Sequence, residues 1–152
     1  MGRGSVTDRG SSHDAVTITD FTRDEQGIII VWAYLEGPNG SLDVRLALDT
    51  GAAMTLVLPE VLDELGYSAR DGDKITSINT ANEVPEQGYR LRVRHFEALG
   101  CVFHAFRIHA HELPDYGVEG LLGMDFLGKF DFEVRISELR IRLERAGSGR
   151  AA

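Results

Sequence analysis

Within the stretch Leu46-Ala47-Leu48-Asp49-Thr50-Gly51-Ala52-Ala53, a single acid stands at the end of an apolar run. A lone carboxylate is costly to bury unless it is paired or hydrogen-bonded, so an acid in this position is a candidate for a tuned pKa. An acid and a glycine after a strand also form an ordinary turn. We therefore take Asp49 as the first candidate catalytic group, with a plain strand end as the alternative.

The residues before Asp49 predict a β-hairpin. Branched and aromatic residues fill 28–35, and Leu42, Val44, Leu46 and Leu48 then alternate with more polar residues, which is typical of a half-buried strand. The intervening Gly37-Pro38-Asn39-Gly40 is strong turn sequence. We expect this hairpin to deliver Asp49 at the end of its second strand.

A second motif lies well downstream and reads Gly120-Leu121-Leu122-Gly123-Met124-Asp125-Phe126-Leu127, two branched residues, a glycine and a short helical start. Together the two motifs resemble the retropepsin-like aspartic proteases, whose half-molecule carries Asp-Thr-Gly-Ala early and an apolar-apolar-Gly element late. The resemblance covers roughly 28–143 and is greatest to the small, single-domain, stand-alone cellular members. It implies an all-β fold with one or two short helices, arranged as a closed β-barrel half-domain that forms a homodimer.

The number of motifs bears on how an active site would be completed. An aspartic protease built as one polypeptide needs two Asp-Thr/Ser-Gly motifs, whereas Asp71-Gly72-Asp73 lacks the hydroxyl residue and leaves only one here. The resemblance therefore implies that both catalytic acids are Asp49, one from each protomer, and that they activate a water without a cofactor. It also implies that Thr50 braces the two loops across the dimer axis and that Gly51 lets the substrate approach closely.

The resemblance further implies a set of substrate-binding residues. A flap made of 74–79 and a return strand over 84–94 would close over bound peptide, although its tip lacks the usual glycines and an ordinary surface hairpin is the alternative. Viral members carry a paired acid and arginine where this chain has Ala53 and Met124. The residues expected to bind substrate are Ala52, Ala53, Thr80, Ala81, Asn82, Val118 and Leu121.

The rest of the chain predicts supporting elements. Pro59 and Gly66 bracket a short helix over 59–65, with Val61, Leu62 and Leu65 facing inward. A strand is expected over 101–108. A terminal hairpin is expected to place the apolar face of 139–143 either in a dimer interface or in the core.

The boundaries of the domain follow from composition. Polar tails over 1–15 and 146–152 are expected to be disordered, which leaves a protease domain at 16–145.

Composition excludes several other classes of function. The net charge of −8 argues against a nucleic-acid partner, and the row Arg90, Arg92 and Arg94 is interpreted as a solvated strand face. His109 and His111 lack a matching third ligand, so a pair of surface histidines is favoured over a metal site. The single cysteine, Cys101, requires no oxidising compartment.

Localisation and partners are inferred from what the sequence lacks. The longest apolar run, 28–35, is too short to span a bilayer, and no secretory signal opens the chain, so a cytoplasmic protein is expected. The expected partners are a second copy and a polypeptide substrate, with no nucleic acid and no membrane.

Three functional hypotheses result. The leading one is an aspartic endopeptidase. The second is a catalytically silent dimerisation or peptide-binding module with the same fold, because fold does not determine function. A metal-dependent hydrolase is the weakest, since His111-Glu112-Leu113-Pro114-Asp115 has an aspartate where the zinc-protease motif needs its second histidine.

Overall fold

The computed structural model describes residues 16–78, 86–114 and 117–146 of the 152-residue chain. Within these ranges the protein is almost entirely β-structure, with two short α-helices. The strands are β1 (Val16–Asp20), β2 (Thr22–Arg23), β3 (Ile29–Gly37), β4 (Gly40–Leu48), β5 (Leu56–Val57), β6 (Asp73–Ile78), β7 (Glu86–Ala98), β8 (Cys101–Ala110), β9 (Gly120–Leu122), β10 (Phe130–Arg135) and β11 (Arg140–Arg145). The helices are α1 (Pro59–Glu64) and α2 (Met124–Leu127), and two 3₁₀ turns are η1 (Ala69–Asp71) and η2 (Ile136–Glu138).

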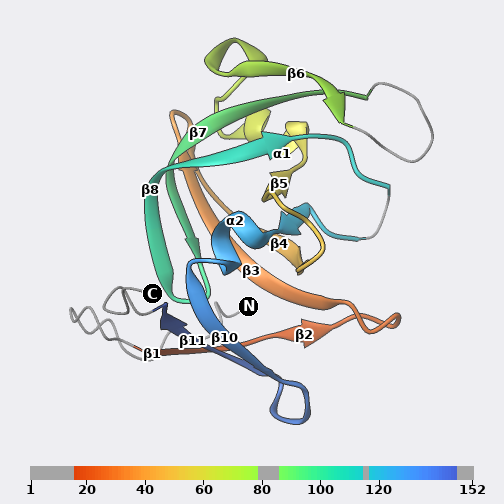
Figure 1. Ribbon diagram of the computed structural model, residues 1–152. Helices are drawn as coiled ribbons and strands as arrows, with labels where there is room; N and C mark the ends of the chain where they lie inside the picture. Colours follow the sequence, from red (N-terminus) through yellow and green to blue (C-terminus); the bar gives the residue numbers. More distant parts are fainter. Residues whose placement is uncertain (1–15, 79–85, 115–116, 147–152) are drawn as a thin grey trace, which may run out of the picture.

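The larger sheet closes on itself (Figure 1). Its strand order is β2-β3-β4-β9-β5-β8-β7-β6, and β3 also pairs with β7. Six strands, from β3 through β4, β9, β5, β8 and β7, therefore form a ring. Closure pairs the strand edges that an open sheet leaves free. The expected all-β fold with a closed barrel is thus confirmed.

The β3–β4 hairpin forms as the sequence predicts. Gly37 pairs with Gly40 across the turn, and the register runs without a break from there to Ile30 and Ala47. Val31 and Leu46 face each other in this register and are completely buried. Alternation of apolar and polar residues therefore sets which face of the hairpin enters the barrel.

Strand β9 brings the two sequence motifs together. It runs parallel to β4, with Leu46 opposite Gly120 and Leu48 opposite Leu122. On its other side β9 pairs with β5, and a Cβ on Gly120 would collide with the carbonyl oxygen of Leu56. Glycine is therefore required at this crossing for steric reasons, and the residues after β4 and after β9 leave the sheet side by side.

The two helices pack by their apolar faces. In α1, which begins at the predicted Pro59, Val61 and Leu62 are buried, and Leu65 at its end is 1% exposed. In α2, Phe126 is completely buried in a group of aromatic rings from β7, β8 and β10. Its ring centroid lies 5.4 Å from that of Phe103 at a near-perpendicular angle, a favoured aromatic geometry. None of the helices in the described part of the chain is long and apolar enough to cross a membrane.

A smaller sheet joins the two ends of the described chain in the order β1-β11-β10 (Figure 1). Its β11 lies in the middle, and its Ile141 and Leu143 are buried in the core of their own chain. Leu139, by contrast, is 45% exposed in the turn that precedes β11. Of the two possibilities for this apolar face, the core position therefore holds for Ile141 and Leu143. The predicted tails at 1–15 and 146–152 lie outside the described residues except for Ala146, whose N–H donates to the carbonyl of Lys129 at 3.2 Å.

Strand β7 is longer at its C-terminal end than the sequence predicts, running to Ala98 instead of Arg94. The reason is that three different strands pair with it. Its first part pairs with β6, its last part pairs with β3, and β8 follows it along most of its length. Pairing with distant segments carries no local signal, so sequence patterns underestimated it.

Candidate active site

Asp49 lies immediately after β4, where the strand leaves the barrel wall. Its backbone N–H donates to the carbonyl of Leu122 at 3.0 Å, which extends the β4–β9 pairing by one residue. Leu46, three residues earlier, is completely buried. The apolar residues of β4 anchor the strand in the core, and the strand places the acid at its end, as the sequence predicts.

The carboxylate of Asp49 is held by its own loop. The backbone N–H of Gly51 donates to Asp49 Oδ1 at 2.9 Å, and the N–H of Ala52 donates to the Asp49 carbonyl at 3.2 Å. This is an Asx-type turn, a conformation that Asp favours. Among the described residues nothing else bonds to this carboxylate, so the second oxygen is left for another partner.

Exposure corrects one expectation from the sequence. The apolar run suggested a buried acid, but Asp49 is half-buried, and Thr50, Gly51 and Ala53 beside it are exposed. The reason is that the strand ends here and the chain turns, with the N–H of Ala52 bonded to the carbonyl of Asp49. In the single chain the Asp-Thr-Gly loop is thus an open surface feature.

A second backbone layer underlies this loop. The N–H of Met124 donates to Ala52 O at 2.8 Å, and that of Asp125 donates to Ala53 O at 3.0 Å. A Cβ on Gly123 would lie 2.6 Å from the carbonyl carbon and oxygen of Met54, closer than real Cβ atoms approach backbone. The late glycine of the second motif is therefore needed for the two loops to stack.

Thr55 and Asp125 join the two loops through their side chains. Thr55 is completely buried, and both its hydroxyl and its N–H donate to Asp125 Oδ1, at 2.6 and 2.9 Å. The Thr55 hydroxyl also accepts from the N–H of Gly123 at 3.2 Å. Sequence reasoning assigned neither residue a role, because they lie far apart in the chain. The available signal was that a hydroxyl residue follows the first motif and that the second motif contains an acid.

Val118 and Leu121, two of the expected substrate-binding residues, belong to an apolar cluster beside Asp49. The cluster is separate from the main core and consists of Ile28, Ile30, Ala47, Val118 and Leu121. Ala47 pairs with Leu121 across the β4–β9 ladder. Because alternate residues of a strand share a face, Ala47 also lies on the same side of the chain as Asp49. The cluster therefore lies next to the candidate catalytic acid.

The expected flap is described only at its base. Strands β6 and β7 are antiparallel neighbours, with Asp73 opposite Arg90 and Ile75 opposite Gly88. The predicted tip residues Thr80, Ala81 and Asn82 lie outside the described residues. Ala52 and Ala53, the other two expected substrate-binding residues, are in the loop stacked on Met124 and Asp125.

The two histidines differ from the expected surface pair. His109 is half-buried in β8, and His111 is only 5% exposed. The strand continues past its predicted end because its backbone pairs with β5, and the N–H of His111 beyond it still donates to the carbonyl of Val57. In the described ranges no three His, Cys, Asp or Glu side chains lie close enough together to hold a metal ion.

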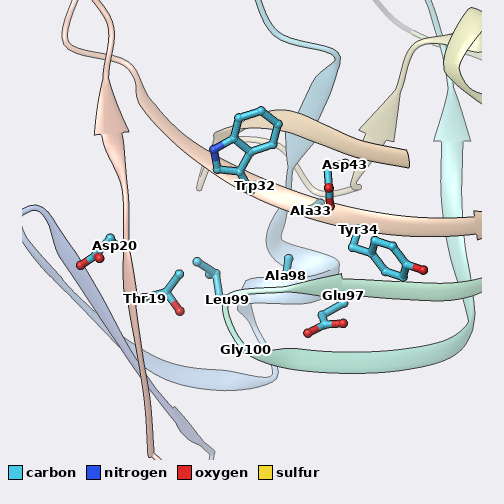
Figure 2. A pocket seen from close by; sticks show the side chains of 10 residues that line it. All are labelled: Thr19, Asp20, Trp32, Ala33, Tyr34, Asp43, Glu97, Ala98, Leu99 and Gly100. Atoms are coloured by element: carbon cyan, nitrogen blue, oxygen red, sulfur yellow. The ribbon is translucent and has the colours of Figure 1, made fainter. Parts of the chain in front are cut away.

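A hollow elsewhere on the barrel contains no residue of the Asp49 loop (Figure 2). It lies between β1, β3 and the β7–β8 turn, and its volume is about 60 Å³. Trp32, 46% exposed, stands on one side of it, and the carboxylates of Asp20, Asp43 and Glu97 lie around it. This acidic hollow is distinct from the candidate active site.

Comparison with known proteins gave a family and a fold. A family model described as "Aspartyl protease" matches residues 35–126, which include both sequence motifs except the last residue of the second. Among solved structures, a retropepsin-like aspartic protease from Rickettsia conorii is similar, with 23% identity and a TM-score of 0.63 over 86% of this chain and 92% of that one. No curated protein matches significantly.

A second solved structure supports the same fold. It is the retroviral protease-like domain of Ddi1 from Leishmania major, with 12% identity and a TM-score of 0.52 over 80% of this chain and 96% of that one. At these identities the similarity concerns the fold alone. The closed barrel with its two short helices is thus retropepsin-like.

Proposed function

Because the chain belongs to the aspartyl protease family, we propose that it is an aspartic endopeptidase that acts as a homodimer. Each protomer contributes one Asp49, and the two carboxylates together activate the water that attacks the peptide bond. Thr50 braces the two loops across the dimer axis. Gly51 keeps the loop thin enough for the substrate backbone to approach.

The observation that carries this proposal is the state of Asp49 in the single chain. One carboxylate oxygen accepts a hydrogen bond from Gly51, and the loop around it is exposed at Thr50, Gly51 and Ala53. In a two-fold symmetric dimer, residues near the axis meet their own copies. An axis beside this loop brings the two Asp49 carboxylates together, and it covers the exposed residues at the same time.

Two adjacent carboxylates have a well-known acid–base behaviour, for which the aspartic-protease pair is the standard case. Like charges a few ångströms apart cannot both ionise easily, so the pair holds one proton between them. One Asp49 is therefore available as a base and the partner's Asp49 as an acid. Neither role needs a cofactor.

The reaction proceeds in two steps. The ionised Asp49 takes a proton from a water molecule while the oxygen of that water adds to the scissile carbonyl carbon. The partner's Asp49 gives its proton to the carbonyl oxygen. The tetrahedral diol then breaks its C–N bond, with a proton passing to the leaving nitrogen and another returning from the diol to the pair. An acid and an amine are released, and no covalent enzyme intermediate forms.

The substrate in this proposal is an extended polypeptide. Extended peptides are recognised through their backbone, with pockets for alternate side chains. The apolar cluster beside Asp49 offers an apolar surface, so we expect an apolar side chain next to the scissile bond. Ala52 and Ala53 contact the substrate backbone, and Thr80, Ala81 and Asn82 cover it from the flap.

The test combines oligomeric state with cleavage. Sedimentation velocity over a range of concentrations is measured together with cleavage of a mixed peptide library, for the wild type and for Asp49→Ala. We expect a dimer in both proteins and cleavage in the wild type only. A wild type that stays monomeric at high concentration and cleaves nothing would instead favour the silent peptide-binding module.

A further inference from the structure

The outer face of β7 and β8 carries a cluster of cations. Leu91 and Val93 of β7 enter the core, so Arg90 and Arg92, which alternate with them, face outward. On the neighbouring strand Arg107 lies directly opposite Arg92. We call the cluster the cationic face, and it consists of Arg70, Arg90, Arg92, Arg107 and Lys129. It is notable in a chain whose net charge is −8.

The cationic face is hollowed. One hollow of about 440 Å³ is lined by Arg70, Arg90, Arg92 and Arg107. A second, of about 300 Å³, is lined by Arg92, Arg107, His104 and Lys129. The two share Arg92 and Arg107, so they adjoin and form one continuous binding surface across the two strands.

Among the described residues, much of this positive charge is not neutralised. Arg90 lies 3.7 Å from the exposed Asp73 carboxylate, but in the described residues neither Arg70 nor Arg107 forms an ion pair. Like charges directly opposite in an antiparallel pair are unfavourable, and Arg92 and Arg107 are such a pair. An anionic ligand between them would remove that repulsion.

Arg92 is also held in place before any ligand binds. Its Nη1 donates to the carbonyl oxygen of Ala105 at 2.9 Å. Ala105 itself has a φ of 52°, a left-handed conformation that is uncommon for a residue other than glycine. An arginine already ordered by its own chain loses less side-chain entropy on binding a carboxylate.

The positive charges of these arginines affect the pKa of a neighbouring histidine. Burial lowers the pKa of His109 first, and the positive charges of Arg90 and Arg107 lower it further. His109 lies opposite Arg90 on the paired strand. This agrees with a positive potential at the surface of the two strands.

The mixed lining of the hollows favours a peptide over a nucleic acid. Asp71 and Asp73 lie at the margin of the first hollow, beside Arg70 and Arg90. A peptide brings carboxylates for the arginines and backbone N–H donors for these two acids. A phosphodiester backbone brings closely spaced negative charges, which the acids and the net negative charge of the protein repel.

We propose that the cationic face docks an acidic segment of a partner polypeptide, with Arg92 and Arg107 binding its carboxylates. The docking site adjoins the candidate active site without being part of it, because Met54 and Asp125 line the second hollow. The inference is independent of the proposed protease activity, since it concerns binding alone.

The test measures binding with a variant that lacks the proposed catalytic acid, so that cleavage does not interfere. Asp49→Ala protein is titrated into a fluorescein-labelled peptide of alternating glutamate and serine at low salt, and fluorescence anisotropy is recorded. The matched probes are the same peptide with lysine for glutamate and a labelled oligothymidylate of equal length. We expect saturable binding of the glutamate peptide, weakened by added salt, and weaker binding of both other probes.

Two pairs of substitutions locate the site. Arg92→Gln with Arg107→Gln is expected to weaken binding of the glutamate peptide about tenfold, because charge-assisted hydrogen bonds are lost. Arg135→Gln with Arg142→Gln removes the same charge from the β10–β11 sheet and is expected to leave the affinity within about twofold. If the first pair fails to fold, Arg107→Gln alone replaces it, since in the described residues its guanidinium forms no hydrogen bond.

Three results would overturn the proposal. They are absence of saturable binding by the glutamate peptide, equal weakening by the two pairs of substitutions, and oligothymidylate binding as tightly as the glutamate peptide. The last would indicate a general polyanion surface. Thermal melting of each variant shows whether a loss of binding reflects loss of the fold.

Discussion

Asp49 and Asp125 follow the neighbouring parallel strands β4 and β9, but the fold surrounds them very differently. Within the described residues the carboxylate of Asp49 accepts a single hydrogen bond, from its own loop, and Asp49 stays half-exposed. Asp125 Oδ1 accepts from the Thr55 hydroxyl, the Thr55 N–H and the Phe126 N–H. An acid bonded within its own chain stabilises the fold, whereas one left partly open is available for water, substrate or a second copy. The comparison predicts opposite consequences for mutating the two.

The largest expected effect is on activity at Asp49. Asp49→Asn keeps an oxygen to accept the Gly51 N–H but removes the ionisable group, so cleavage should fall on the order of 10³-fold. Because the side chain is half-exposed and its loop bond survives, the melting temperature should hardly change. Rates on a cleaved library peptide and thermal melts check both parts. A variant that retains wild-type activity would refute the catalytic role.

The next effect is on stability at Asp125. Asp125→Ala leaves the buried Thr55 hydroxyl and two backbone N–H groups without their acceptor, which should cost about 3 kcal/mol in the free energy of unfolding. Asp125→Asn keeps an acceptor oxygen at the same place and should cost less than about 1 kcal/mol. Urea denaturation of both variants measures the difference. Equal losses would mean that the charge matters more than the hydrogen bonds.

A pair of glycine substitutions compares the same two loops through their backbones. Gly123→Ala puts a Cβ 2.6 Å from the Met54 backbone and should cost about 2 kcal/mol, because the Asp49 loop must move. Among the described residues, a Cβ at Gly51→Ala meets only the Asp49 carboxylate, at 3.2 Å, and the change should cost under about 0.5 kcal/mol in stability. Urea denaturation of both proteins tests this. A Gly51→Ala protein as unstable as Gly123→Ala would show that the Asp49 loop is not open.

The smallest effect is a pH dependence of the stability of the protein, caused by His109, whose pKa is influenced by Asp125. Burial, followed by the charges of Arg90 and other neighbours, lowers the pKa of His109 below its ordinary value of 6.5, while Asp125 partly opposes this. The unfolded chain then takes up the proton first as pH falls, so stability is complete above pH 6.5 and declines below it. Melting temperatures between about pH 5 and 8 should fall less steeply for His109→Gln than for the wild type. Identical slopes would exclude this contribution.

Much of the scaffold around Asp49 was predictable because its signals are local. The alternation before Asp49, the Gly-Pro-Asn-Gly turn and Pro59 each act over a few residues, and the hairpin and α1 formed where they indicate. The pairing of the two motifs has no such local signal and is seen in the β4–β9 register. The role of Asp49 in catalysis remains a prediction that the experiments above address.

Other features depend on contacts between residues far apart in the chain, which no local sequence pattern predicts. The Thr55–Asp125 bond joins residues that are 70 positions apart, and β7 gains its last residues by pairing with β3. The burial of His111 likewise arises from its backbone bond to Val57 in β5. Each was missed or misjudged because its cause is a contact between distant segments.

The sequence by itself determined the β3–β4 hairpin and its turn, the buried face of α1 and the single Asp-Thr-Gly acid, because these follow from residue chemistry at short range. Only the tertiary structure decided that Asp125 is hydrogen-bonded to a distant part of the chain while Asp49 is bonded within its own loop. It also decided that Arg92 of β7 lies opposite Arg107 of β8. The physical reason is closure of the barrel. It brings remote backbone and side chains within bonding distance, and that distance sets the burial and the hydrogen bonds of each group.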